Sequence, residues 1–245
     1  MSDKDLVKAQ YGRVKGASWF PLLYKKDIMV LGQGGIGSWT SLLLSRIGCD
    51  LHIFDMDRYE EHNMTGQLVK QSDIGKLKTE AMKNVIEEMS PDATVTTYGR
   101  YEETSPAGDI MICGFDNMVA RKIAFQNWKH AGTNKDMFFQ DGRLLAEQLQ
   151  IFNIPGDRPD LIELYEKEYL FDDSEVAEAP CTFKQTSHCA AMIASKMVGF
   201  LTNWISGMKM SVPFKYEYLI PLNYTNNDNP TIPGQPSEQQ VFEVQ

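Results

Sequence analysis

The chain has 245 residues, of which 42% are hydrophobic and 23% are charged, as in ordinary soluble globular proteins. Its formal net charge is −9 at pH 7, which argues against a nucleic-acid backbone as the main partner. The first residues lack the apolar run of a secretory signal. The most apolar late stretch, around 189–205, contains Lys196 and is too short and too polar to span a membrane. We therefore expect a cytoplasmic protein.

A nucleotide-binding unit is predicted near the start of the chain. An apolar run at 28–31 predicts a buried strand, and the glycine-rich turn GQGGIG at 32–37 leads into a segment with apolar residues at helical spacing. A second strand, 51–54, ends on Asp55. This order is typical of a βαβ unit in which the helix N-terminus binds phosphate and the acid binds ribose.

Helices and strands alternate along the rest of the chain. We expect helices at 75–89, 118–130, 160–169 and 187–206, and strands at 94–98, 109–113, 137–140, 148–154 and, as edge strands, within 214–224. The predicted fold class is α/β, with a doubly wound, mostly parallel, Rossmann-like sheet and an antiparallel C-terminal extension. Asp55, Asp116 and Asp141 fall at predicted strand ends, so we expect three acids around one crevice.

The cysteines and histidines show no metal-ligand spacing. No Cys-x-x-Cys pair occurs among the 4 cysteines, so we expect neither a zinc site nor a disulfide framework. Cys49, Cys113 and Cys189 stand in apolar surroundings and are predicted to pack in the interior.

Five motifs follow one another in a characteristic order. They are Gly32-Gln33-Gly34-Gly35-Ile36-Gly37, Asp55-Met56-Asp57, Asn63 with Gln67, Gly75-Lys76-Leu77-Lys78, and Phe115-Asp116-Asn117. In this order and spacing they resemble the ThiF/MoeB and ubiquitin-activating family, over about residues 11–205. The resemblance implies ATP-dependent adenylation of the C-terminal carboxylate of a small ubiquitin-like or sulfur-carrier protein or of a peptide.

The resemblance also implies roles for single residues. The nucleotide-binding set is Gly32, Gly34, Gly35, Gly37, Asp55, Asp57, Asn63, Gln67, Lys78, Asp116 and Asn117. Within it, Asp55 takes the ribose hydroxyls, and Lys78 neutralises charge on the phosphates. Asp116 holds Mg²⁺, a hard cation that prefers oxygen ligands.

Gly66 departs from the family pattern, which has a phosphate-contacting arginine there. In the family, a second arginine comes from the N-terminal segment of the partner subunit, and Tyr11-Gly12-Arg13 resembles part of that segment. We therefore expect a homodimer in which residues 1–26 cross to the partner and Arg13 reaches its site. Arg58, Lys70 or Arg143 would supply some of the missing charge. Residues 27–224 would form the adenylation domain and 225–245 a flexible tail.

Cys181 resembles the cysteine of the family's crossover loop, where the activated protein is taken as a thioester. The resemblance implies that Cys181 is a nucleophile. The acidic stretch before it would raise the pKa of its thiol, and a structural or idle cysteine is the alternative.

Two other functions fit parts of the sequence. A nicotinamide- or flavin-dependent oxidoreductase would use the same glycine turn, but it leaves Lys78 and Asp116 unexplained. A non-catalytic partner subunit of an activating heterodimer would explain Gly66.

Overall fold

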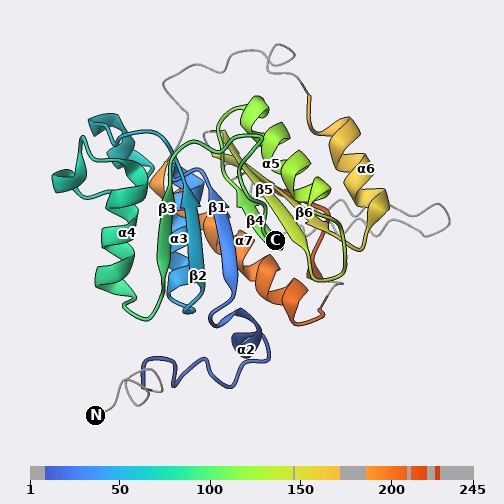
Figure 1. Ribbon diagram of the computed structural model, residues 1–245, viewed down its shortest axis with the longest axis horizontal. Coiled ribbons are helices and arrows are strands. Elements are labelled where there is room, and N and C mark those ends of the chain that lie inside the picture. Colours follow the sequence, from blue (N-terminus) through green and yellow to red (C-terminus); the bar gives the residue numbers. More distant parts are fainter. Residues whose placement is uncertain (1–8, 146, 172–185, 209–210, 220–223, 227–245) are drawn as a thin grey trace, which may run out of the picture.

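A computed structural model describes residues 9–145, 147–171, 186–208, 211–219 and 224–226. Its centre is a sheet with the strand order β3-β2-β1-β4-β5-β6-β7-β8 (Figure 1). Parallel pairing joins β1 (Asp27–Leu31), β2 (Asp50–Phe54), β3 (Val95–Tyr98), β4 (Ile110–Cys113) and β5 (Phe138–Leu145). Antiparallel pairing adds β6 (Gln148–Pro155), β7 (Lys215–Leu219) and β8 (Tyr224–Asn226). The predicted fold class is confirmed.

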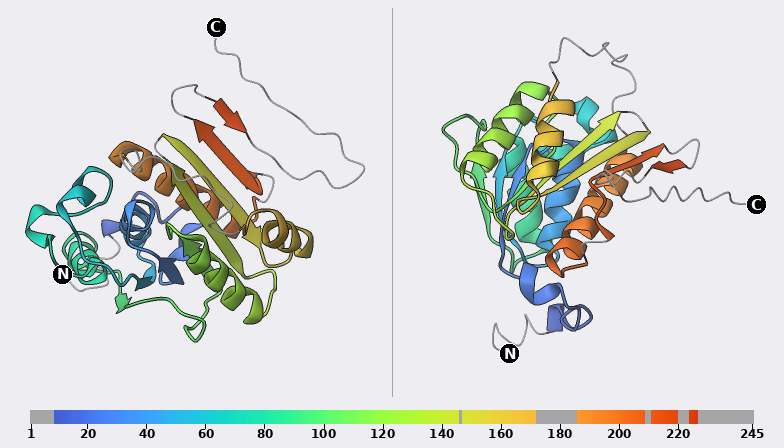
Figure 2. Two further views of the ribbon diagram at one scale, coloured as in Figure 1. Left: turned by 90° about the horizontal axis from the view of Figure 1, so that it is seen from above. Right: turned by 90° about the vertical axis from the view of Figure 1, so that its right-hand side faces the viewer.

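Helices cover both faces of the sheet (Figures 1 and 2). α3 (Gly35–Ser45), α4 (Lys78–Met89) and α7 (Ser187–Ile205) pack on one face, and α5 (Met118–His130) and α6 (Pro159–Glu168) pack on the other. One hydrophobic core lies on each face of the sheet. Because successive side chains of a strand point to opposite faces, β1 contributes residues to both cores. Ile28 and Val30 belong to the core under α3, whereas Met29 and Leu31 belong to the core under α5.

Several predicted boundaries shift in the structure. The helix expected from residue 75 begins at Lys78, because Leu77 is still paired with Arg58 in an isolated β-bridge. β5 runs on to Leu145, since its antiparallel partner β6 continues the ladder beyond the end of β4. The sheet includes residues up to Asn226, while 227–245, the rest of the predicted tail, lie outside the described residues.

The segment before β1 packs against its own chain. The Tyr11 ring contacts those of Phe20 and Tyr24, with centroids 5.0 and 5.4 Å apart, and its hydroxyl lies 3.3 Å from Asp92 Oδ2. These residues, together with α2 (Phe20–Leu23), lie at the end of the sheet where β1 begins. In the described part of the chain, no helix is both long and apolar enough to cross a membrane.

Candidate functional site

A cavity of about 1560 Å³ opens at the carboxyl ends of the parallel strands. Its walls include Gly32 after β1, Asp55 after β2, Gly114 after β4 and Arg143 of β5. Ligands of open α/β sheets bind at this edge. Pockets for one small ligand usually measure about 300–1,000 Å³, so this cavity has room for a nucleotide and part of a second substrate.

The glycine turn brings the first turn of α3 to the cavity. Gly32 has a φ of +87°, which favours glycine, and a Cβ there would lie 3.1 Å from the carbonyl oxygen of Gly114. Gly34, the N-cap of α3, has no side-chain cap, and a Cβ on it would meet nothing within 4 Å. The free N–H groups of this helix end therefore suit an anion in the cavity.

Replacing two glycines of the turn is expected to separate folding from binding. In Gly37→Ala the new methyl group would lie 1.7 Å from the carbonyl oxygen of Gly32, which should lower the free energy of unfolding by about 3 kcal/mol. In Gly34→Ala the methyl group enters open space, so stability should change by less than about 1 kcal/mol. That methyl group should nevertheless weaken ATP binding by about tenfold. Urea unfolding and calorimetric titration would measure both, and equal stability of the two variants would contradict the packing described for Gly37.

Asp55 is held in place by two backbone N–H groups. Gln33 N donates to Asp55 Oδ2 at 2.7 Å, and Asp57 N donates to Asp55 Oδ1 at 2.8 Å. Burial raises the pKa of the Asp55 carboxyl above its usual value, and the nearby Lys78 ammonium only partly offsets this. The carboxylate oxygens thus lie at a fixed place on the cavity wall.

The raised pKa of Asp55 predicts a pH dependence of nucleotide binding. The carboxyl takes up a proton at a higher pH than a free aspartate with a pKa near about 3.9, and it then loses acceptor capacity. Nucleotide affinity should therefore fall as the pH drops through the raised pKa of Asp55. The free energy of unfolding should respond in the opposite sense. Because the Asp55 carboxyl binds its proton more tightly in the folded state than in the unfolded state, the free energy of unfolding is higher at low pH and falls as the pH rises through the folded-state pKa. Calorimetry across pH on wild type and Asp55→Asn would check this, and an unchanged slope in the variant would refute it.

Lys78 begins α4 and is buried beside the cavity. It is only 7% exposed, and its Nζ lies 3.3 Å from Oδ2 of the exposed Asp57. The backbone N–H of Lys78 also donates to the Asp57 carbonyl at 2.9 Å. The ammonium group is therefore held at a fixed position on the same wall as Asp55.

Asn63 and Gln67 also line the cavity, but they differ in what they bind. Asn63 Oδ1 accepts a hydrogen bond from Glu60 N at 2.9 Å and so caps the short 3₁₀ helix η1 (Glu61–Thr65). The buried Gln67 Oε1 has no hydrogen-bond partner among the described residues. A buried acceptor without a donor is unusual in proteins, and a ligand hydroxyl or amino group would satisfy it.

Asp116 and Asn117 lie at the N-terminus of α5. Asn117 Oδ1 accepts from Ala120 N at 2.8 Å, so this side chain caps the helix, and its Nδ2 lies 3.3 Å from Asp116 Oδ1. The Asp116 carboxylate is exposed on the cavity wall. Among the described residues no group of three or more His, Cys, Asp or Glu side chains forms a metal site. A single exposed carboxylate such as that of Asp116 is an oxygen ligand of the kind that Mg²⁺ uses when phosphate oxygens supply the other contacts.

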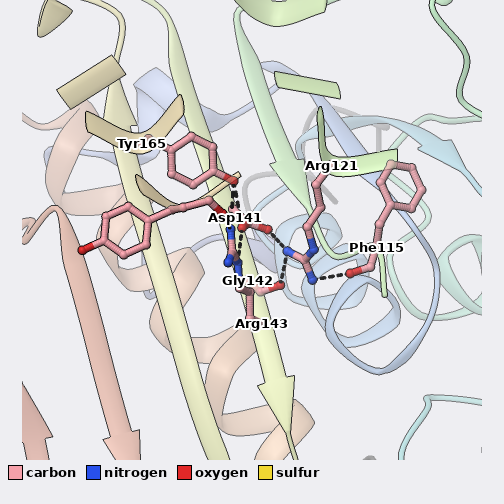
Figure 3. A network of polar contacts seen from close by, with 7 residues as sticks. Phe115, Arg121, Asp141, Gly142, Arg143 and Tyr165 are labelled. Atoms are coloured by element: carbon pink, nitrogen blue, oxygen red, sulfur yellow. Dashed lines mark hydrogen bonds and ion pairs between the residues drawn. The ribbon is translucent and has the colours of Figure 1, made fainter. Parts of the chain in front are cut away.

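Asp141 does not face the cavity, and the prediction of three acids around one crevice is wrong for it. Its side chain is fully buried and points to the layer of α5 and α6 (Figure 3). There it pairs with Arg121 and with Arg143, whose Nε lies 2.7 Å from Asp141 Oδ2, and it accepts a hydrogen bond from the Tyr165 hydroxyl at 2.9 Å. Asp141 lies on the same face of β5 as Arg143, which does line the cavity, but its three partners cover the Asp141 carboxylate.

Other predicted residues lie in different places. Arg13 is exposed and does not line this cavity, and Lys70 pairs with Glu88 outside it. Cys181 lies outside the described residues. The remaining cysteines, Cys49, Cys113 and Cys189, are buried, as predicted.

Sequence reasoning missed several charged residues of the site: Glu60, Arg100, Glu102 and Glu103, which are exposed, and one that is buried, Arg121. It lies four positions after Asn117 on α5 and lines the cavity although it is only 6% exposed. The sequence signal for Arg121 is its position one helical turn after Asn117, the last residue of the Phe115-Asp116-Asn117 motif.

The strand order, the glycine turn and the acid after β2 define a nucleotide-binding α/β protein of Rossmann-like architecture. A family model, that of the ThiF family, matches residues 21–240. The chain therefore belongs to the ThiF family, which confirms the resemblance that the motifs indicated.

Curated relatives match parts of the chain. The tRNA threonylcarbamoyladenosine dehydratase of Haemophilus influenzae is 33% identical over 110 residues, which are 44% of this chain and 42% of the relative. The ubiquitin-like modifier-activating enzyme 5 of Mus musculus is 26% identical over an alignment of 169 residues that covers 56% of this chain and 42% of the relative. The chain thus spans less than half the length of these relatives.

Among solved structures, Escherichia coli MccB with ATP has a TM-score of 0.67 at 18% sequence identity, over 86% of this chain and 66% of that one. At this identity the likeness shows the shared fold.

Proposed function

We propose that this protein binds ATP with Mg²⁺ and adenylates a carboxylate. The observation that carries the proposal is one cavity that combines a buried cation, Lys78, with an exposed carboxylate, Asp116, beside the uncapped N-terminus of α3. A dinucleotide site needs the glycine turn and Asp55 but neither of these two groups. A triphosphate with its metal ion needs both.

The residues act by placing charge and by orienting the nucleotide. The N–H groups at the start of α3 bind phosphate, and Asp55 fixes the ribose. When the carboxylate of the second substrate attacks the α-phosphorus, a new P–O bond forms and pyrophosphate leaves with the electrons of the broken P–O bond. Lys78 counters the negative charge that gathers there. Mg²⁺, held by Asp116, would neutralise phosphate oxygens when bound.

The second substrate is proposed to be the C-terminus of a small ubiquitin-like or sulfur-carrier protein or of a peptide. The similarity to a ubiquitin-like modifier-activating enzyme supports this class. The dehydratase relative suggests tRNA as an alternative. The net charge of −9 opposes binding of a nucleic acid.

Pyrophosphate exchange tests the proposal. Labelled pyrophosphate enters ATP only when adenylation is reversible and a carboxylate acceptor is present. The acceptors to try are small proteins that end in diglycine, synthetic peptides and tRNA. We expect exchange with a protein or peptide acceptor, dependent on Mg²⁺ and lost in Asp116→Asn. Exchange with tRNA alone would overturn the proposed substrate class, and binding of NAD or FAD in place of ATP would overturn the reaction.

We also propose a homodimer in which Arg13 serves the partner's site. Arg13 is exposed and lies two residues after Tyr11, which packs on Phe20 and Tyr24 just before β1, whereas the cavity opens at the carboxyl ends of the strands and Arg13 does not line it. It therefore cannot reach the site of its own subunit. In the same scheme, residues 27–224 form the adenylation domain, and the segment 1–26 presents Arg13 to the partner while Tyr11, Phe20 and Tyr24 stay packed on their own subunit.

Complementation between variants should reveal this shared site. Arg13→Ala and Lys78→Met homodimers should each be inactive in pyrophosphate exchange. In a hybrid dimer one site keeps Lys78 from its own subunit and Arg13 from the other, so mixing the two variants after denaturation and refolding should restore about a quarter of wild-type activity. Full activity of Arg13→Ala alone would refute the proposal.

A further inference from the structure

The buried cluster around Asp141 carries an excess of positive charge. One carboxylate, fully buried, faces two guanidinium groups, and the side chains of Arg121 and Arg143 are 7% and 13% exposed. The third partner, Tyr165, is a neutral hydroxyl that donates to the carboxylate. Within these described contacts the cluster has a net charge of about +1, and a buried charge is costly unless an opposite charge is near.

The excess charge lies at the cavity. Arg121 and Arg143 both line it. β4 and β5 are in register with Cys113 beside Asp141, so Gly114 and Gly142 are neighbours at the strand ends.

The first turn of α3 packs over these strand ends. Cβ positions on Gly114 and Gly142 would lie 3.3 and 3.2 Å from atoms of Ile36. β1 and β5 are two strands apart, or about 10 Å. The arginines approach the cavity from the α5 and α6 side of the sheet and the glycine turn from the α3 side, and both line the same cavity.

Gly66 leaves a gap in positive charge on the same cavity wall. It lines the cavity, and its carbonyl accepts a hydrogen bond from Trp39 Nε1 at 3.3 Å. Of the three residues expected to supply the missing positive charge, Lys70 pairs with Glu88 outside the cavity. Arg58 is exposed, with Nη1 donating to the Gly75 carbonyl at 2.8 Å. Arg143 alone of the three belongs to a buried, multiply bonded group.

We propose that Arg121 and Arg143, which share Asp141, form an anion site that binds phosphate groups of the nucleotide in place of the arginine absent at Gly66. The inference rests on the proposed binding of ATP.

Asp141 is the positioning residue of this site. It holds Nε of Arg143 at 2.7 Å, while Nη2 of Arg143 donates to the Tyr169 carbonyl at 2.7 Å and the guanidinium lies 4.7 Å from the centre of the Phe152 ring. Arg121 is fixed in turn by the carbonyls of Phe115 and Gly142. Charges held in this way need little reorganisation when an anion binds.

Calorimetric titration with ATP and with adenosine separates the phosphate contribution from the rest of the nucleotide. Arg143→Met should weaken ATP binding by about 10- to 100-fold and leave adenosine binding unchanged. Arg143→Lys keeps the charge but loses the planar fork, so it should weaken ATP binding by a smaller factor. The matched control Lys70→Met removes a surface cation outside the cavity and should change neither affinity.

Unchanged ATP binding in both Arg143 variants, or an equal loss for ATP and adenosine, would overturn the anion site. Titration with tripolyphosphate, which has no nucleoside, distinguishes a failure of the anion site from a failure of the proposed ATP binding. Wild-type protein that binds tripolyphosphate through Arg143 but does not bind ATP retains the anion site and loses the ATP proposal. If Arg143→Met does not fold, Arg143→Lys alone decides, with wild-type affinity for ATP counting against the site.

Discussion

Asp141→Asn is expected to lower the free energy of unfolding by about 3–5 kcal/mol. Asparagine has nearly the shape of aspartate, but among the described residues it removes the only carboxylate that pairs with the buried guanidinium groups of Arg121 and Arg143. Each guanidinium would keep its backbone carbonyl partners and lose its counter-charge. The variant should therefore leave two buried positive charges close together, and urea unfolding would measure the cost.

Asp160→Asn provides the matched control. Asp160 also pairs with an arginine, Arg158, at 2.6 Å, but the side chains are 52% and 40% exposed. Exposed pairs contribute only about 0–1 kcal/mol, so this variant should unfold almost as the wild type does. If Asp141→Asn and Asp160→Asn have the same free energy of unfolding, the buried ion pairs of Asp141 with Arg121 and Arg143 do not stabilise the fold.

Lys78→Met is expected to reduce the rate of pyrophosphate exchange by about 100- to 1,000-fold, as the loss of one fixed charge donor at a transition state does in other enzymes. Methionine keeps the length and apolar stem of the side chain and removes the ammonium group. Asp57, the partner of Lys78, is 57% exposed and stays hydrated without it. The Lys78→Met variant should therefore fold, so a lower rate of pyrophosphate exchange would reflect the loss of the ammonium group from the reaction.

Lys83→Met on the same helix is the control for that variant. Lys83 pairs with Glu87 one turn along α4, with an exposed fraction of 41%, and it does not line the cavity. Its exchange rate should equal that of the wild type. Equal rates for Lys78→Met and the wild type would exclude Lys78 from the reaction.

The parallel half of the fold was predictable because its signals are local. The glycine turn, the apolar runs and the acid after β2 lie within one short stretch, and each follows from backbone geometry or from alternation. The extent of β5 was not predictable in this way. It depends on its pairing with β6, and the residues beyond Gln140 carry no distinct strand pattern.

The candidate site was only partly predictable for a similar reason. Asp55 and Asp116 stand at strand ends where sequence position decides their place, and the structure brings both to the cavity. Asp141 also stands on a strand of that edge, but its direction depends on Arg121 and Tyr165, which come from two helices far along the chain. Contacts of this kind follow from tertiary packing and leave no mark in the local sequence.

Calorimetric titration of the whole protein with ATP plus Mg²⁺, and separately with NAD and with FAD, tests the central claim most directly. The cavity should bind ATP in a Mg²⁺-dependent way through Lys78 and Asp116, so Lys78→Met and Asp116→Asn should weaken ATP binding and the dinucleotides should bind poorly or not at all. Binding of NAD or FAD without binding of ATP would contradict the account, because a dinucleotide has no triphosphate and needs no metal ion, which would leave Lys78 and Asp116 without the roles assigned to them.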